Sequence, residues 1–376
     1  MQLSEQELIR RENLQKIKDL GIDPFPPELF PVNANAVEIK ANYLEEVLED
    51  GTKNRLNYQG VALAGRIMAQ REAGKAMFMN LQDSTGQIQL YLRRDELGNG
   101  EDFTLFDVLI KKLLDIGDVV GVKGFAFKTK MGEITVHVQS FTLLAKSLRP
   151  LPSVKRDAEG NVHDAFTDPE LRYRMRYVDL IVNPEVKETF LKRTRLINSL
   201  RQFLNENGAL EVETPVLQPI PGGAAARPFI THQNALDVPF YLRIANELYL
   251  KRLIVGGFDW VYEFSRNFRN EGMDRTHNPE FTILEFYVAY KDYFWMMDFT
   301  ERLLERAALD TCGSTDVQVG DNLLSFKAPF RRMSILDGIR EHTGIDVSGM
   351  DEAGLREFCK KLDIHAEPSW GKGKLI

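Results

Sequence analysis

Cysteine is scarce in this sequence. Among its 376 residues there are two cysteines, Cys312 and Cys359, and no histidine-rich spacing accompanies either of them. Two isolated cysteines supply neither a disulfide framework nor the ligand set of a structural zinc site. The sequence therefore excludes a small disulfide-stabilised scaffold, and we expect no metal site in this chain.

Long hydrophobic runs are also missing. No stretch approaches the roughly 18 consecutive apolar residues of a membrane span. The first residues, Met1–Glu5, have neither the basic segment nor the apolar core of a secretory signal. We therefore expect a cytoplasmic protein that has no membrane partner.

An excess of positive charge is the third absence. The chain has 48 Lys and Arg against 55 Asp and Glu, which gives a net charge of −7. Such a balance excludes a histone-like coat for nucleic acid, and any nucleic-acid surface must be local. The sequence has no internal repeat or low-complexity tract, and its length is sufficient for two or three domains.

The most informative segment lies between residues 262 and 287, where the pattern predicts a strand, a polar loop and a second strand. One strand face has Tyr262, Phe264, Arg266 and Phe268, and the other has Glu263, Ser265, Asn267, Arg269 and Glu271. The loop adds Arg275 and His277. Cations and carboxylates at this density indicate a site for a phosphate-bearing ligand that also carries an amine. The alternative is a solvated hairpin with surface ion pairs.

Residues 56–148 show a different pattern, with short alternating strands separated by turn residues. The expected strands are Val61–Ala69, Met77–Asp83, Gln87–Arg93, Asp118–Phe127 and Glu133–Thr142. Hairpin turns are expected at Ser84–Gly86 and Lys130–Gly132, and one helix near Phe103–Leu114. Five strands and one helix predict an OB-fold β-barrel.

The rest of the chain is expected to be mixed, so that the fold class is α+β. Residues 1–55 form a helical extension, which Ser4 and Glu7 open with a capping box. Residues 149–182 are expected to be an irregular linker. In residues 183–376, a helix begins at Pro184 and ends at Asn207-Gly208, and a short strand over Leu210–Glu213 follows.

Several short segments of the sequence resemble one known protein family. Arg269-Asn270-Glu271 and His277–Thr282 resemble motif 2 of the class II aminoacyl-tRNA synthetases, in the wording of the bacterial type of lysyl-tRNA synthetase. Further matches are Ile220–Ala224, Ala226–Thr231 and Tyr241–Lys251. The resemblance runs from near residue 5 to the last residue. It implies an antiparallel-sheet catalytic domain over residues 183–376, and a homodimer, because the helix and strand before Pro215 resemble the dimer element, motif 1.

The resemblance also implies a site for ATP. Arg269 would be the catalytic cation, holding an α-phosphate oxygen and the lysine carboxylate as they join. Glu271 would recognise adenine, and Phe281 would stack on its ring. Arg275 and His277 would hold the outer phosphates.

For lysine, the resemblance implies Glu247 at the α-ammonium, Glu285 and Tyr287 at the ε-ammonium, and Gly223 in a loop that closes over the amino acid. Arg269 is shared with the ATP site. For tRNA(Lys), it implies three anticodon readers in the barrel, namely Arg66, Phe78 and Gln89. The alternative for Phe78 is a place in the barrel core. The basic residues of the first helix, such as Arg10, fit either a solvated arm or a nonspecific tRNA contact.

The sequence departs from the family in one respect. Nothing resembles motif 3, the glycine-rich element whose arginine clamps ATP, or the acidic residues that hold Mg²⁺. We therefore expect an incomplete catalytic domain that forms little lysyl-adenylate alone. Three alternatives stay open: an aspartyl or asparaginyl enzyme of the same class, an elongation-factor lysine ligase, which lacks the barrel, and a catalytically inactive tRNA-binding fragment.

Overall fold

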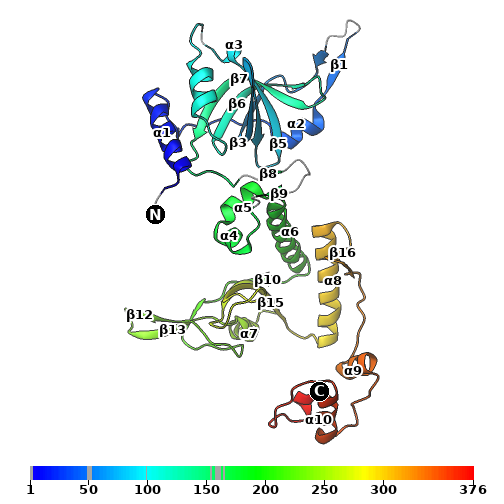
Figure 1. Ribbon diagram of the computed structural model, residues 1–376. Coiled ribbons are helices and arrows are strands. Elements are labelled where there is room, and N and C mark those ends of the chain that lie inside the picture. The colour runs from blue at the N-terminus through cyan, green and yellow to red at the C-terminus, as the bar shows by residue number, and fades with distance from the viewer. Residues whose placement is uncertain (1–2, 49–52, 99, 153–154, 157–161, 164–165) are drawn as a thin grey trace. The chain divides into compact units, whose positions relative to one another are not determined.

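The computed structural model describes residues 3–48, 53–98, 100–152, 155–156, 162–163 and 166–376 (Figure 1). It divides into two compact units, Met1–Pro184 and Glu185–Ile376. Each unit has its own sheet and its own hydrophobic core.

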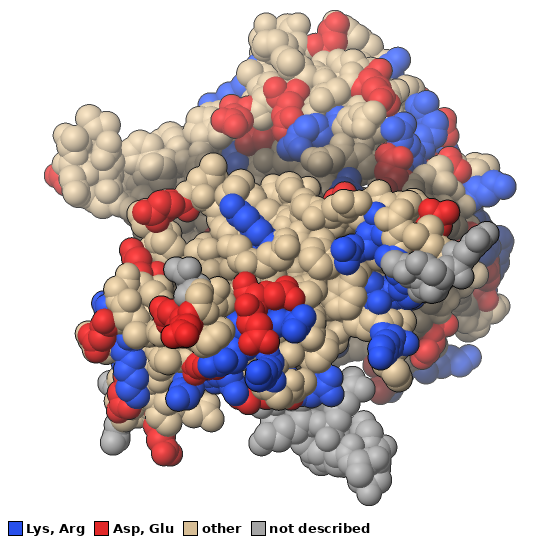
Figure 2. Space-filling view, turned by 90° about the horizontal axis from the view of Figure 1, so that it is seen from above, with Lys and Arg blue, Asp and Glu red and all other residues tan. Residues whose placement is uncertain are grey.

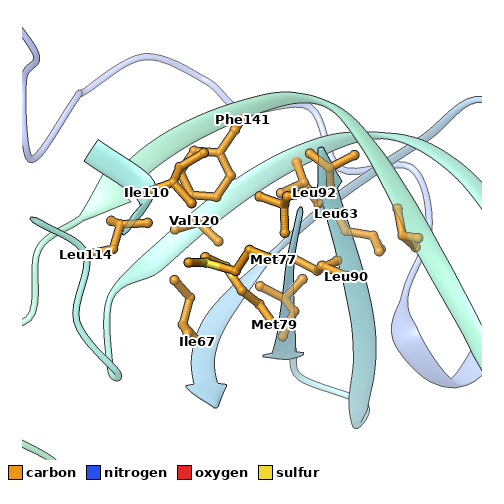
Figure 3. Packing of buried hydrophobic residues seen from close by; sticks show 14 of the residues in the cluster. Leu63, Ile67, Met77, Met79, Leu90, Leu92, Ile110, Leu114, Val120 and Phe141 are labelled. Carbon is orange, nitrogen blue, oxygen red and sulfur yellow. The ribbon is translucent and has the colours of Figure 1, made fainter. Parts of the chain in front are cut away.

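A closed five-stranded barrel forms the centre of the first unit, as the alternating pattern predicted. Its strands are β3 (Val61–Ala73), β4 (Ala76–Gln82), β5 (Gln87–Arg93), β6 (Val119–Lys128) and β7 (Ile134–Ala145), in the order β3-β4-β5-β7-β6. Only β5 and β7 pair in parallel; the other neighbours are antiparallel. Alternate residues point inward, so that Met77, Met79 and Leu90 are buried together in the core (Figure 3).

Short helices surround the barrel. They are α1 (Glu5–Asp19), α2 (Ala36–Asn42), α3 (Arg94–Leu97) and the π-helix η1 (Leu105–Leu113). The capping box of Ser4 and Glu7 is confirmed. Arg10 is not a solvated or RNA-facing residue, because it is 7% exposed and donates to the carbonyls of Ser147 and Ile116. A cation in the middle of α1 thus fastens this helix to the ends of barrel strands.

The stretch expected to be an irregular linker contains two helices, α4 (Pro169–Arg174) and α5 (Arg176–Val182). Asp179 explains why they form: its fully buried carboxylate accepts from the side chains of Arg172, Arg176 and Asn183. The two-residue strands β8 (Lys155–Arg156) and β9 (Val162–His163) pair with each other, as do β1 (Glu45–Val47) and β2 (Lys53–Arg55). Residues 153–154, 157–161 and 164–165 of the expected linker lie outside the described residues.

The second unit begins with α6 (Pro184–Glu206), as predicted from Pro184 and the Asn207-Gly208 stop. The expected strand at residue 210 is β10 (Leu210–Glu211), which pairs in parallel with β14 (Trp260–Phe268). Strand β14 pairs antiparallel with β15 (Glu280–Val288) over its whole length, which confirms the strand, loop and strand of the sequence pattern. The first strand ends at Phe268, however, so that Arg269 and Glu271 lie beyond it.

The remaining elements complete the second unit, which we call the sheet unit. They are β11 (Leu217–Gln218), β12 (Ile230–Gln233), β13 (Val238–Leu242), α7 (Glu247–Val255), α8 (Tyr293–Cys312), β16 (Asp316–Val319), β17 (Asn322–Ser325), α9 (Ile335–Thr343), α10 (Glu352–Lys361) and α11 (Lys372–Leu375). Strands β11, β13 and β12 form a separate sheet. Helix α8 contributes Phe299 and Leu303 to a core with Leu204 and Tyr262.

Two features of the surface bear on function. Figure 2 shows Lys and Arg side chains intermixed with Asp and Glu over one face, as expected for a chain with a net charge of −7. In the part of the chain that the structure describes, no helix is both long enough and apolar enough to cross a membrane.

Candidate functional site: a polar sheet face and a ring-covered barrel

The two faces of the β14–β15 hairpin differ in chemistry. Tyr262 and Phe264 point to the core face, where they pack with Phe286 and Phe299. The opposite face, which we call the site face, brings cross-strand partners together because successive side chains alternate. Its pairs are Val261 and Tyr287, Glu263 and Glu285, Ser265 and Ile283, and Asn267 and Phe281.

A buried ion pair lies under the site face. Glu263 is 3% exposed and Arg243 is 4% exposed, and Arg243 Nη1 donates to Glu263 Oε1 at 2.7 Å. Glu263 also accepts from the side chains of Thr214, at 2.7 Å, and Asn246, at 3.1 Å. The alternative of a solvated hairpin is therefore wrong for this strand. Sequence reasoning placed Glu263 on this face but missed Arg243, which comes from another segment 20 residues earlier.

Arg269 follows the end of β14 and lies over Phe281. Its guanidinium carbon is 5.1 Å from the Phe281 ring centroid, and its backbone N–H donates to Pro279 O at 2.8 Å. Arg269 Nε and Asn267 Nδ2 are both buried and have no hydrogen-bond partner within the described residues. Buried donors are normally paired. Both of these donors are closed to solvent, so a ligand would meet the exposed part of the half-buried Arg269 side chain instead.

The loop between the strands has the other residues predicted to bind ATP. Glu271, Arg275 and His277 are all exposed. Asp274 organises this loop: it accepts from the backbone N–H groups of Thr276 and His277, and it lies 2.8 Å from His277 Nδ1. The hydrogen bond from the Thr276 backbone, followed by the one from the His277 side chain, holds the pKa of Asp274 well below its ordinary value. The structure thus places the His277 ring beside the Asp274 carboxylate in an exposed loop. This contact is separate from the one between Arg269 and Phe281.

The predicted lysine ligands form an acidic group. Tyr287 Oη donates to Glu285 Oε1 at 2.6 Å on the site face. Burial, then the hydrogen bond and charge of Glu285, and then the charge of Glu247 raise the pKa of Tyr287. Both carboxylates therefore act on the same phenol, although Glu247 belongs to α7.

Gly223 lies against the beginning of α7. Its φ is +86°, and a Cβ added there would be 3.0 Å from Ala245 Cβ and 3.1 Å from Glu247 Cβ. Only glycine combines this backbone conformation with such a close approach. The loop at residue 223 is thereby held beside the side chain of Glu247.

The barrel presents a second candidate surface. Phe78 is half-buried on the outer face of β4, between the inward residues Met77 and Met79, so that it is not part of the core. Its ring centroid is 5.0 Å from that of Tyr91 on β5. Further rings, not singled out from the sequence, continue this surface onto β6 and β7: they are Phe125, Phe127 and His137. The alternation over Gly124–Phe127 and Val136–Val138 was the signal that would have found them.

Gln89 and Arg66 differ in their availability. Gln89 lies on the same outer face, where its Oε1 accepts from Thr135 Oγ1 at 2.9 Å, so that its amide N–H₂ group remains the donor. Arg66 Nη1 donates to Gly117 O at 2.6 Å. Burial lowers the pKa of Arg66 despite the nearby charge of Asp118. Arg66 is thus tied to the barrel backbone through one of its nitrogens.

No metal centre emerges from the described parts of the chain. Among residues 3–48, 53–98, 100–152, 155–156, 162–163 and 166–376, no three His, Cys, Asp or Glu side chains come together in a way that could hold an ion.

Comparison with known proteins gives two family matches. A model of class II tRNA synthetases (D, K and N) matches residues 168–370, and a model of an OB-fold nucleic acid binding domain matches residues 61–144. The first match includes the site face and its loop, and the second includes the ring-covered face of the barrel.

Curated relatives match along the whole chain. A lysine–tRNA ligase of Porphyromonas gingivalis (strain ATCC 33277) is 60% identical over 376 residues, and one of Christiangramia forsetii is 59% identical over 375. Each match covers 100% of this chain and 64% of the relative. A lysine–tRNA ligase of Azobacteroides pseudotrichonymphae is 54% identical over 374 residues, which are 73% of its length. This chain thus spans less than two thirds of the length of the first two.

Proposed function

We propose that this chain, which belongs to the class II tRNA synthetases (D, K and N), is part of a lysine–tRNA ligase. The whole protein would activate lysine with ATP to lysyl-adenylate and transfer the lysyl group to tRNA(Lys). The observation that carries the proposal is the polar site face, on which Glu285 accepts from Tyr287 at 2.6 Å, while Glu247 of α7 pairs with a lysine that lies over the same tyrosine ring. A ligand with two ammonium groups and one carboxylate complements this charge pattern.

Activation joins the lysine carboxylate to the α-phosphorus of ATP and releases pyrophosphate. The protein contributes mainly positioning and charge stabilisation to such a transfer. Arg269, whose side chain is half-buried, offers planar N–H groups for the α-phosphate oxygen and the incoming carboxylate. Phe281, beneath Arg269, provides an apolar face for adenine.

The loop between β14 and β15 would complete the nucleotide site. We assign Glu271 to the amino group of adenine, and Arg275 and His277 to the outer phosphates. His277 Nδ1 lies 2.8 Å from Asp274, so that the ring is held within the loop and Nε2 is the ring nitrogen left for a phosphate.

Lysine would bind between α7 and the site face. We assign its α-ammonium to Glu247 and its ε-ammonium to Glu285 and Tyr287, while the loop at Gly223 closes over it. A half-buried carboxylate favours a long cation, because a neutral or anionic side chain would leave the carboxylate unpaired. This is the physical basis for lysine over aspartate or asparagine.

The barrel would read the anticodon. Phe78 offers a ring on which a base can stack, and the Gln89 amide lies one strand away on the same outer face. Arg66, fixed by Gly117 O, would serve as a backbone or base contact. Together these groups fit a single-stranded RNA loop better than a duplex.

Three further features belong to the proposal. Mg²⁺ would accompany ATP and shield its phosphates, with ligands in the part of the family's length that this chain does not span. A homodimer would form through α6, whose Leu191 and Leu196 are 42% and 38% exposed. Such an enzyme would act in the cytoplasm, where translation uses its product.

The decisive test is ATP–pyrophosphate exchange by the full-length protein, with lysine, aspartate and asparagine supplied separately. We expect exchange with lysine alone. Exchange with aspartate or asparagine and none with lysine would assign the protein to another member of the class. No exchange with any amino acid, together with retained tRNA binding, would favour an inactive RNA-binding protein.

A further inference from the structure

Lys251, on the second turn of α7, lies beside Glu247 of the proposed lysine site. Its Nζ is 2.5 Å from Glu247 Oε1 and 5.8 Å from the centroid of the Tyr287 ring. Tyr287 in turn donates to Glu285. One cation of the chain itself therefore pairs with Glu247 and lies over the ring of Tyr287, the tyrosine that donates to Glu285.

An ion pair between a glutamate and a lysine four residues later is common on helix surfaces, where it stabilises the helix slightly. Two contacts make this pair different. Glu247 does not point into open solvent, because its Cβ and Oε2 lie 3.1 Å and 3.8 Å from the position of a Cβ on Gly223. Lys251 lies over a tyrosine of the site face. The pair therefore lies between the substrate loop and the sheet.

The charges give the pair a consequence for binding. An alkylammonium group on Glu247 is the same chemical contact whether it comes from Lys251 or from the α-ammonium of an amino acid. When the substrate takes this place, one ion pair is broken and a similar one is made. The side-chain exposures, 53% for Lys251 and 31% for Glu247, mean that the lysine head can move into water at little cost.

We propose that Lys251 is a resident counter-ion of Glu247 that the substrate displaces, and that it thereby sets the affinity and selectivity for lysine. The inference rests on the proposed function. Because the exchange at Glu247 is nearly balanced and every amino acid has the carboxylate that Arg269 would hold, the preference for lysine must come from its second ammonium, which Glu285 and Tyr287 would receive. An amino acid without that second cation gains little from the site.

The test uses Lys251→Met in the full-length enzyme, since methionine keeps much of the apolar stem and removes the charge. An exposed ion pair changes an equilibrium by up to about fivefold. We therefore expect a two- to fivefold lower KM for lysine in ATP–pyrophosphate exchange, with the KM for ATP unchanged. Norleucine, which lacks the ε-ammonium, should bind more tightly by a similar factor when tested as an inhibitor.

Two matched variants separate charge from structure. Lys251→Arg keeps a cation near Glu247, and the KM for lysine should remain within about twofold of the wild-type value, as expected for a surface pair. Arg252→Met removes a cation from the neighbouring residue, whose guanidinium lies 4.6 Å from the Tyr249 ring, and should leave the KM for lysine unchanged. A purely structural role would instead give Lys251→Met a lower melting temperature and no selective effect on lysine.

An unchanged or higher KM for lysine in Lys251→Met would overturn the inference. So would an equal decrease in Arg252→Met, because the effect would then be one of general charge. If the wild-type enzyme itself shows no exchange with lysine, the proposed function fails, and that result is distinct from a failure of the displacement alone.

Discussion

The barrel and the sheet unit separate stability from recognition in different ways. Every barrel strand has two neighbours, and the interior is filled by side chains such as Leu63, Met79 and Val120. The rings proposed to read RNA, such as that of Phe78, lie on the outside. In the sheet unit, by contrast, the site face contains the buried pair of Arg243 and Glu263, and orphan donors lie beside it. The barrel can therefore change its reading surface without changing its core. The sheet unit holds its chemistry and part of its stability in the same residues.

The largest expected effect is on the stability of the sheet unit. Glu263→Gln should lower its free energy of unfolding by about 3–5 kcal/mol, because the Arg243 guanidinium is left buried without its carboxylate. Urea unfolding of the 376-residue chain, followed by circular dichroism, measures this loss. The control is Glu280→Gln, which breaks the exposed pair with Arg266 and should cost less than about 1 kcal/mol. Equal losses of unfolding free energy in the two variants would mean that the Arg243–Glu263 pair contributes no more than an exposed ion pair.

The next effect concerns catalysis. Arg269→Ala should reduce ATP–pyrophosphate exchange by the full-length protein about 10²–10³-fold, as for the loss of one preorganised donor in a transition state. Arg266→Ala is the matched control, because Arg266 lies three residues earlier on the strand and is exposed. If both variants kept normal exchange, Arg269 would be structural and its free Nε would need another explanation.

A smaller effect is expected at the amino-acid site. Glu285→Gln keeps the volume of the side chain and removes its charge. We expect a loss of about 2 kcal/mol in lysine use, at the lower end for one partner of a charge pair because Glu285 is only half-buried. Steady-state exchange with lysine and ATP varied separately measures it, and the KM for ATP should not move. A normal dependence on lysine would leave Glu285 with only its bond to Tyr287.

The smallest effect is predicted for the barrel, and it tests the comparison directly. Phe78→Ala should weaken binding of a U-rich anticodon stem-loop by about 1–2 kcal/mol, with little change in barrel stability. Met79→Ala, one residue away but facing inward, should destabilise the barrel by about 2–5 kcal/mol. Stem-loop binding and thermal unfolding of both variants separate these roles. Reduced stability with normal binding in Phe78→Ala would make Phe78 a packing residue.

Patterns local in sequence predicted most of the fold. The strands of the barrel were located to within a few residues, because inward Met77, Met79 and Leu81 alternate with outward neighbours. Helices α4 and α5 were missed, because their order depends on the convergence of Arg172, Arg176 and Asn183 on one buried carboxylate. Apolar periodicity carries no information about such a cluster.

The residues of the candidate site could be predicted where they lie within a recognisable sequence motif. The motif assigned Arg269 and Phe281 to the same nucleotide site, and the structure brings these two side chains together. Glu285 was placed on the correct strand face. The partners of Glu263 could not be predicted, because Arg243 and Thr214 come from segments whose approach depends on the tertiary fold. The roles of Glu271, Arg275 and His277 stay predictions, since their loop is exposed.

The aromatic core beneath the sheet also divides the molecule optically. All three tryptophans, Trp260, Trp295 and Trp370, follow residue 185, whereas the barrel has tyrosine and phenylalanine. Trp260 and Trp295 are 5.5 Å apart between centroids, and Trp295 stacks on Phe299 at 5.0 Å. Excitation at the red edge, where only indole absorbs, therefore reports on the sheet unit and is silent about the barrel. The chain has a built-in fluorescent label that can follow ligand binding or unfolding in one unit while the other changes unseen.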